Sequence, residues 1–128
     1  MSGKASKHRQ GRLNEEIKKS ISSLLVNGIK DPRLSGRIIT VSGVEVTRDA
    51  SYATCYVTPL VLADEDRDAV CKEVLAAFNS AKGVFRTQIG RDIKMRKVPE
   101  LIFKIDSSME YGRHIDEILD TLEYNNEE

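Results

Sequence analysis

Apolar residues recur at intervals of three and four in three parts of the chain, and this spacing is typical of one face of an α-helix. The three stretches cover residues 11–27, residues 67–81 and residues 84–93. Gly28 ends the first, and an Asp31-Pro32-Arg33 turn follows, because proline disfavours helical geometry in the residue before it. A shorter apolar stripe within residues 106–122 predicts one more helix near the end of the chain.

The segments between these helices show the alternation of β-strands. Residues 38–47 alternate out of phase on either side of Ser42-Gly43, which predicts a strand with a β-bulge at that glycine. Residues 52–59 and 100–105 alternate without interruption. The inward face of the strand at residues 52–59 consists of small side chains, and a helix can approach such a face closely. These side chains are Ala53, Cys55 and Val57.

The predicted order is helix, strand, strand, helix, kink, helix, strand, which indicates an α+β fold with a three-stranded sheet and helices packed on one face. With 128 residues, the chain suits one domain. We expect a flexible basic arm over residues 1–10, one domain over residues 11–122 and an acidic tail over residues 123–128. The basic start lacks the apolar segment of a secretory signal, and no apolar run reaches the ~18 residues of a membrane span. The expected location is the cytoplasm.

Charge is segregated along the chain although its net value is zero. Residues 1–33 hold eight cations and three anions, residues 82–97 hold six cations and one anion, and residues 106–128 hold eight anions and one cation. A basic face and an acidic tail favour a polyanion such as nucleic acid, although charge runs are also common on solvated faces. A protein-protein adaptor that uses the acidic last helix is the alternative. The candidate RNA-binding residues are Lys82, Gly83, Arg86, Arg91, Lys94, Arg96 and Lys97, with Arg9 and Arg12 near the N-terminus.

The kink is expected at Ala81-Lys82-Gly83. A glycine within continuous helical periodicity costs about 1 kcal/mol relative to alanine, so it marks a bend or a close backbone approach. We therefore expect Gly83 to set the angle between the two helices.

Candidate catalytic and metal-binding residues are absent from the pattern. Cys55 and Cys71 have no cysteine or histidine at metal-ligand spacing, and no nucleophile, base or phosphate loop stands out. The acidic residues Asp64, Glu65, Asp66 and Asp68 are better explained as an N-cap and first-turn anions of the second helix than as a cation site. Tyr52 and Tyr56 suit either cross-strand packing or stacking on bases. The expectation is a protein with no enzymatic activity, no metal and no cofactor.

The predicted order of elements resembles that of a type II KH domain, a module that clamps single-stranded RNA. Two helices joined at a small-residue kink come after two strands and before a third. KH domains carry a Gly-x-x-Gly loop between these helices, whereas this chain has Ala81-Lys82-Gly83. With this Ala-x-Gly kink in place of the loop, the chain resembles the ribosome-binding factor A family, whose members are bacterial assembly factors of the small ribosomal subunit. The resemblance extends over residues 8–122. Its other segments are Asp31-Pro32-Arg33, Thr40-Val41-Ser42-Gly43-Val44, Asp49, Tyr56-Val57, residues 96–106 and residues 115–119.

The resemblance implies a KH-like domain that binds the free or immature small (30S) ribosomal subunit and its 16S ribosomal RNA. It further implies a role in late processing of that RNA, growth in the cold and release before translation, with other assembly factors as possible partners. Such a factor is expected to be a monomer. The missing Gly-x-x-Gly loop argues against the usual KH mode of RNA recognition, and the separated cations of the third helix are expected to follow phosphates instead.

Overall fold

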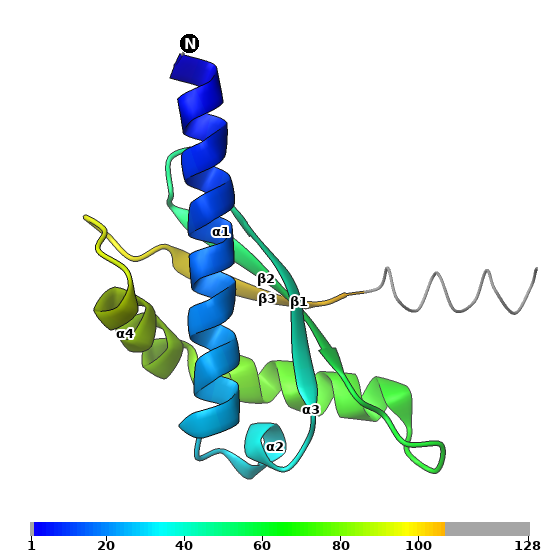
Figure 1. Cartoon of the computed structure of the whole chain (residues 1–128). Coiled ribbons are helices and arrows are strands. Elements are labelled where there is room, and N and C mark those ends of the chain that lie inside the picture. The colour runs from blue at the N-terminus through cyan, green and yellow to red at the C-terminus, as the bar shows by residue number, and fades with distance from the viewer. Residues whose placement is uncertain (1, 107–128) are drawn as a thin grey trace, which may run out of the picture.

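A computed structural model describes residues 2–106, with side chains from residue 11 onward (Figure 1). Its elements are α1 (Ser2–Asn27), α2 (Pro32–Ser35), β1 (Ile39–Val46), β2 (Tyr52–Pro59), α3 (Arg67–Ser80), α4 (Lys82–Asp92) and β3 (Glu100–Ile105). The predicted order is confirmed, with α2 as an addition. The helix predicted within residues 106–122 and the acidic tail lie outside the described residues.

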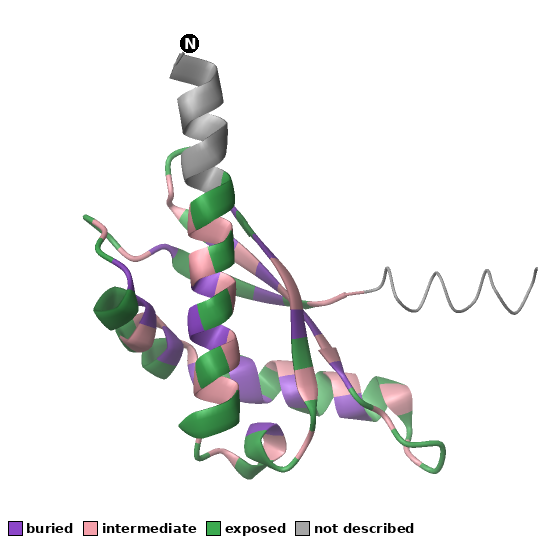
Figure 2. Cartoon of the chain, viewed as in Figure 1, coloured by how far each residue is buried: buried purple, intermediate pink, exposed green. Residues whose placement is uncertain are grey.

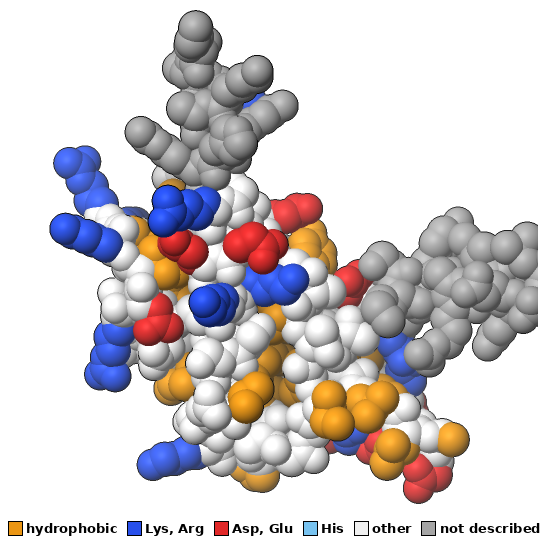
Figure 3. Space-filling view, in the orientation of Figure 1, with side chains coloured by type: hydrophobic (Ala, Val, Ile, Leu, Met, Phe, Trp, Pro, Cys, Tyr) orange, Lys and Arg blue, Asp and Glu red, His pale blue; other side chains and the backbone are white. Residues whose placement is uncertain are grey.

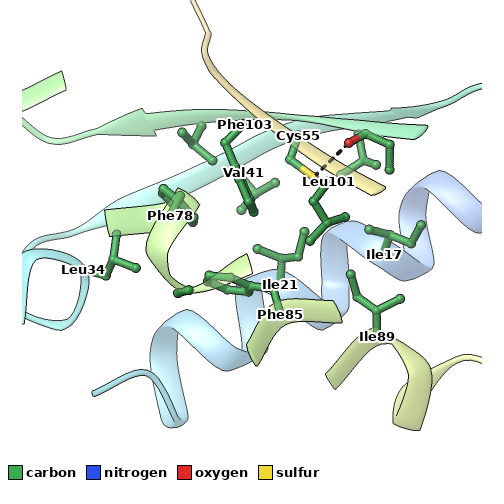
Figure 4. Close-up of a cluster of buried hydrophobic side chains, with 14 of the residues drawn as sticks. Ile17, Ile21, Leu34, Val41, Cys55, Phe78, Phe85, Ile89, Leu101 and Phe103 are labelled. Atoms are coloured by element: carbon green, nitrogen blue, oxygen red, sulfur yellow. Dashed lines mark hydrogen bonds between the residues drawn. The ribbon is translucent and has the colours of Figure 1, made fainter. Parts of the chain in front are cut away.

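The three strands form one sheet in the order β1-β2-β3. β1 pairs antiparallel with β2, as a hairpin requires, whereas β3 pairs parallel to β2. A parallel pair needs a crossover connection, and α3 and α4 together supply it. Figure 4 shows the strands on one side of the buried cluster and the helices on the other. The predicted α+β fold, with a three-stranded sheet covered by helices on one face, is therefore confirmed.

The small-residue face of β2 lies at the centre of the core. Ala53, Cys55 and Val57 are fully buried, as the alternation predicted. Buried positions also follow one side of each helix (Figure 2). Phe78 of α3, Phe85 of α4 and Phe103 of β3 pack together, with ring centroids 4.7–5.7 Å apart (Figure 4). These aromatic contacts join the crossover helices to the third strand.

The β-bulge is confirmed at the predicted place. Val41 pairs with Val57, and after the irregularity Gly43 pairs with Tyr56. The extra residue restores the phase of the strand, so that Val41, Val44 and Val46 are all buried on the core side. Without it, the second half of β1 would turn its valines to solvent.

One boundary predicted near the N-terminus is wrong, and one predicted turn forms a short helix. α1 begins at Ser2 and not at Gly11, because no proline interrupts residues 2–10 and most of them are compatible with a helix. Whether residues 1–10 act as a separate arm remains a prediction. The turn after α1 is the short helix α2, in which Pro32 occupies the first position and Asp31 is the N-cap. The Asp31 carboxylate accepts hydrogen bonds from the backbone and the guanidinium of Arg33, which lower its pKa.

The kink between α3 and α4 is confirmed, but its physical origin differs from the prediction. Ala81 is the single residue between the two helices, and its side chain is buried. Gly83 lies in the first turn of α4 without a positive φ. Apart from its chain neighbours and the backbone of its own helix, no atom lies within 4 Å of the place where a Cβ would stand. Val84, expected on the apolar side of α4, is 52% exposed. The buried residues on either side of Ala81 therefore set the interhelical angle, and Gly83 does not.

An ion pair closes the connection between β2 and α3. Both oxygens of Glu65 accept from the Arg37 guanidinium, at 2.8 and 2.5 Å, and Arg37 also donates to the Leu60 carbonyl at 2.9 Å. The backbone N–H of Leu62 donates to the same carboxylate at 2.9 Å. Of the four acidic residues expected to start α3, Asp66 is the N-cap, whereas Glu65 fastens the connection to the start of β1.

We expect Gly83→Ala to raise the free energy of unfolding by about 0.4–1 kcal/mol, because alanine reduces the conformational entropy of the unfolded chain and its Cβ meets open space. Gly90→Ala in the same helix is the matched control, since its Cβ would lie 3.3 Å from Val98 Cγ2 and should stabilise less. Urea unfolding measures both. A destabilised Gly83→Ala protein would show that the glycine is needed for the kink.

The Arg37–Glu65 pair should also make stability depend on pH. Hydrogen bonds from Arg37 lower the pKa of Glu65 from 4.5 to about 2. A lowered carboxyl pKa adds stability that is complete above pH 4.5 and is lost as the pH falls toward 2. As the pH falls through this range, the melting temperature should therefore decrease less steeply for Glu65→Gln than for the unchanged protein. The exposed neighbour Asp64→Asn is the control, and parallel curves for all three proteins would contradict the assignment.

Candidate nucleic-acid interface

The cations of α4 and of the α4–β3 connection occupy the sides that core packing leaves in solvent. Phe85 and Ile89 are fully buried and Ile93 nearly so, which determines the side of α4 that faces the core. Figure 3 shows Lys and Arg side chains along the edge of the molecule formed by α4 and this connection. Five of the predicted RNA-binding residues are exposed here, and Lys82 is half-buried at the start of α4. The five are Gly83, Arg91, Lys94, Arg96 and Lys97.

The anion within this segment links two helices. Ser20 of α1, which is only 3% exposed, donates its hydroxyl to Asp92 Oδ2 at 2.7 Å, and Gln88 donates to Asp92 Oδ1 at 2.8 Å. Both carboxylate oxygens therefore take part in hydrogen bonds. Asp92 fastens the end of α4 to α1, which places the cations of the two helices on neighbouring surfaces.

Arg86, predicted to bind RNA, has a structural role. Its Nε donates to the Pro99 carbonyl at 3.3 Å, and Nη2 donates to the Val98 carbonyl at 3.0 Å. Glu100 lies 3.6 Å from Nη1. The guanidinium thus connects α4 to the chain entering β3. The sequence pattern could not distinguish it from the exposed cations, because the residues that it contacts lie twelve to fourteen positions further along the chain.

α1 adds cations on the adjoining surface. Arg12 is 83% exposed and forms an ion pair with Glu16 at 3.2 Å. Such exposed pairs contribute at most about 1 kcal/mol, so Arg12 can exchange Glu16 for a phosphate. Lys19 is exposed and Lys18 half-buried. Arg9 lies within α1, and its side chain is outside the described part of the structure.

Arg48 is a further exposed cation that the sequence pattern did not single out. It lies in the turn between β1 and β2, beside residues 49–51, and these line a common cavity with Arg96 and Lys97. The pattern identified this turn as a hairpin connection. It held no signal that the turn would meet the α4–β3 connection, because that proximity depends on how the crossover returns to the sheet.

The two tyrosines of β2 lie on the other face of the sheet. Their neighbours Ala53, Cys55 and Val57 are buried, and alternation therefore points Tyr52 and Tyr56 away from the core. Tyr52 is 50% exposed and pairs in register with Glu100, while Tyr56 lies between Gly43 and Lys104. Glu100, the register partner of Tyr52, lies 3.6 Å from the guanidinium of Arg86 in α4. Stacking of the two tyrosines on bases remains a prediction.

Chemically reactive groups are scarce in the described part of the chain. Burial raises the pKa of the Cys55 thiol to about 12, so it is not a nucleophile near neutral pH. Within residues 11–106, no group of three or more His, Cys, Asp or Glu side chains could hold a metal ion. No helix among the described residues has the length and apolar character needed to cross a membrane.

Comparison with known proteins identifies relatives over almost the whole chain. The model of the family "Ribosome-binding factor A" matches residues 9–119. Ribosome-binding factor A of Clostridium botulinum (strain Loch Maree / Type A3) is 44% identical over 119 residues, which cover 93% of this chain and 94% of the relative.

Solved structures agree in fold. The crystal structure of ribosome-binding factor A from Thermus thermophilus superposes with a TM-score of 0.57 at 23% identity, covering 80% of this chain and 97% of the other. A second match, with a TM-score of 0.53 at 24% identity, covers 79% and 94%. It is a homology model of the Thermus thermophilus protein fitted into the cryo-electron microscopy map of its complex with the 30S subunit. The predicted KH-like fold is thereby confirmed.

The different roles of the cations can be tested on α4. We expect Arg86→Ala to lower the free energy of unfolding by about 1–2 kcal/mol, since the change removes charged hydrogen bonds to the Val98 and Pro99 carbonyls. Arg91→Ala, on the exposed side of the same helix, is the matched control and should change stability by less than about 0.5 kcal/mol. Urea unfolding measures both, and equal effects would contradict the structural role of Arg86.

Proposed function

Because the chain belongs to the ribosome-binding factor A family, we propose that it binds the small (30S) ribosomal subunit through its 16S ribosomal RNA. The fitted 30S complex of the Thermus thermophilus protein supports this proposal. Family membership alone does not say which surface makes the contact. The distribution of charge in this chain favours one surface over the others.

The observation that carries the proposal is the group of exposed cations on α4 and on the connection that follows it. Arg91, Lys94, Arg96 and Lys97 are exposed along α4 and its exit, while the anion among them, Asp92, is hydrogen-bonded to Ser20 and Gln88. Cations of α1 lie on the adjoining surface. We define this set as the basic edge: Arg12, Lys18, Lys19, Arg91, Lys94, Arg96 and Lys97.

The kink supports contact through side chains. In KH domains, a loop between two helices lets the RNA backbone approach the protein backbone. Here Ala81 alone joins α3 to α4, and its carbonyl accepts from the N–H of Phe85 at 3.1 Å. Without a loop to cradle phosphates, the cations of the basic edge make the contact. With about four phosphates neutralised, log K should fall with log salt at a slope of roughly −3 to −4.

The family resemblance supports the remaining features of this proposal. The protein acts without catalysis as a monomer in the cytoplasm, where small subunits are assembled. It promotes late processing of 16S ribosomal RNA, in company with other assembly factors, and it aids growth in the cold. The alternative is a protein-protein adaptor whose partner binds the acidic C-terminal helix, which lies outside the described residues.

Sedimentation with isolated small subunits, large subunits and joined ribosomes tests the proposal. We expect the protein to sediment with small subunits, and this binding to weaken as salt rises. A variant with Lys94, Arg96 and Lys97 all changed to Glu should bind at least about tenfold more weakly, because three favourable contacts with phosphates become repulsive.

The control changes the same charge elsewhere. Lys30, Lys72 and Lys104 are exposed outside the basic edge, and changing all three to Glu should leave binding to small subunits nearly intact. Thermal melts confirm that both variants are folded. Equal binding by the basic-edge variant and the unchanged protein would favour the adaptor. Equal loss in both variants would indicate a response to overall charge.

A further inference from the structure

A small cavity lies where three distant parts of the chain meet. It encloses about 210 Å³ and is lined by Leu13 of α1, by residues 49–51 of the β1–β2 turn and by residues 95–97 of the α4–β3 connection. This volume is below the roughly 300–1,000 Å³ of sites for drug-sized ligands. It suits a single planar ring system better than a larger ligand.

The lining divides into an apolar floor and a cationic rim. Leu13, Ala50 and Met95 are partly buried against the hydrophobic core, so they form a fixed floor. Arg96 and Lys97 are exposed at the rim. An apolar floor suits the face of an aromatic ring, and a thioether adds a favourable sulfur–ring contact. The rim suits the phosphates on either side of that ring.

The third part of the lining offers a fixed acceptor. Asp49 accepts hydrogen bonds from the Ser51 hydroxyl at 2.8 Å and from the Ser51 N–H at 3.1 Å, and also from the Thr47 hydroxyl at 2.8 Å. These hydrogen bonds lower the pKa of Asp49, so the carboxylate stays ionised at neutral pH. Its remaining lone pairs can accept from an amino or imino group of a ligand.

The backbone of this turn is strained at the cavity. Ala50 has φ 58°, and it alone among the described non-glycine residues has a positive φ. The N–H of Ala50 donates to the Thr47 carbonyl at 2.9 Å, which helps to hold this conformation. Strain in a residue other than glycine persists where the surroundings determine it, and such residues are frequent at ligand sites. Here the strained residue is part of the floor.

We propose that this cavity receives one unpaired nucleobase of RNA, with the ring against Leu13, Ala50 and Met95 and the adjoining phosphates against Arg96 and Lys97. Asp49 then accepts from an amino or imino group at the edge of the base. This inference rests on the proposed RNA binding and adds a preference for single strands to it. Bases within an A-form duplex are stacked and cannot enter a cavity of this kind.

Short single-stranded RNA of mixed sequence, with 2-aminopurine at one position, serves as the probe, and the same sequence as a duplex is the comparison. We expect tighter binding of the single strand and a change in 2-aminopurine fluorescence. Met95→Ala, which removes part of the floor, should weaken single-strand binding about threefold to tenfold. Duplex affinity and the slope of log K against log salt should stay unchanged.

Two further variants separate the contributions. Met95→Leu keeps an apolar floor and should retain most of the single-strand affinity, which excludes misfolding as the cause of a loss in Met95→Ala. Lys97→Ala should weaken single-strand and duplex binding alike and reduce the salt slope by about one, as expected for a phosphate contact. Unchanged single-strand binding by Met95→Ala, or equal affinity of the unchanged protein for single strand and duplex, would overturn the proposal.

The outcome is independent of the test for small-subunit binding. If the protein sediments with small subunits but Met95→Ala leaves single-strand binding unchanged, only the proposal of a nucleobase in the cavity is overturned. A fluorescence change that depends on Met95, without sedimentation on small subunits, would support the cavity and contradict the ribosomal target.

Discussion

Close packing of helices against one face of the sheet is the constraint on which the rest of the structure depends. β2 runs through the centre of the sheet, and its core face carries only Ala53, Cys55 and Val57, all fully buried. Larger side chains at these positions would hold the helices further from the sheet. Because the face is shallow, aromatic rings from α3, α4 and β3 can fill the space above it (Figure 4).

The charged surface is a consequence of this packing. α4 turns Phe85 and Ile89 toward the core, so its exit must leave the cations of residues 91–97 on the opposite sides. Ser20 and Asp92 then fasten that end of the helix to α1. The part of the basic edge that lies on α1 and α4 loses little backbone freedom when it meets a polyanion, and this preorganisation favours binding.

Much of the fold could be predicted because local periodicity carries the information. The extent of β2 and β3, the bulge at Ser42-Gly43 and the buried stripe of α3 all follow from alternation or helical spacing. The errors occurred where local rules leave a choice. No capping or breaking residue near the N-terminus specifies where α1 begins. The cost of a glycine within a helix suggested that Gly83 was needed for close packing, but the space around it is open.

The sequence by itself determined the order of elements, most of the core residues and the segregation of charge, because each depends on neighbours in the chain. Its motifs also indicated the family. Only the tertiary structure decided which cations face solvent, since Arg86 meets carbonyls that the crossover brings back to α4. It also assigned Glu65 to Arg37 and brought the β1–β2 turn to the α4–β3 connection, where the cavity forms. These contacts join residues far apart in the chain, and their geometry depends on the packing of the whole domain.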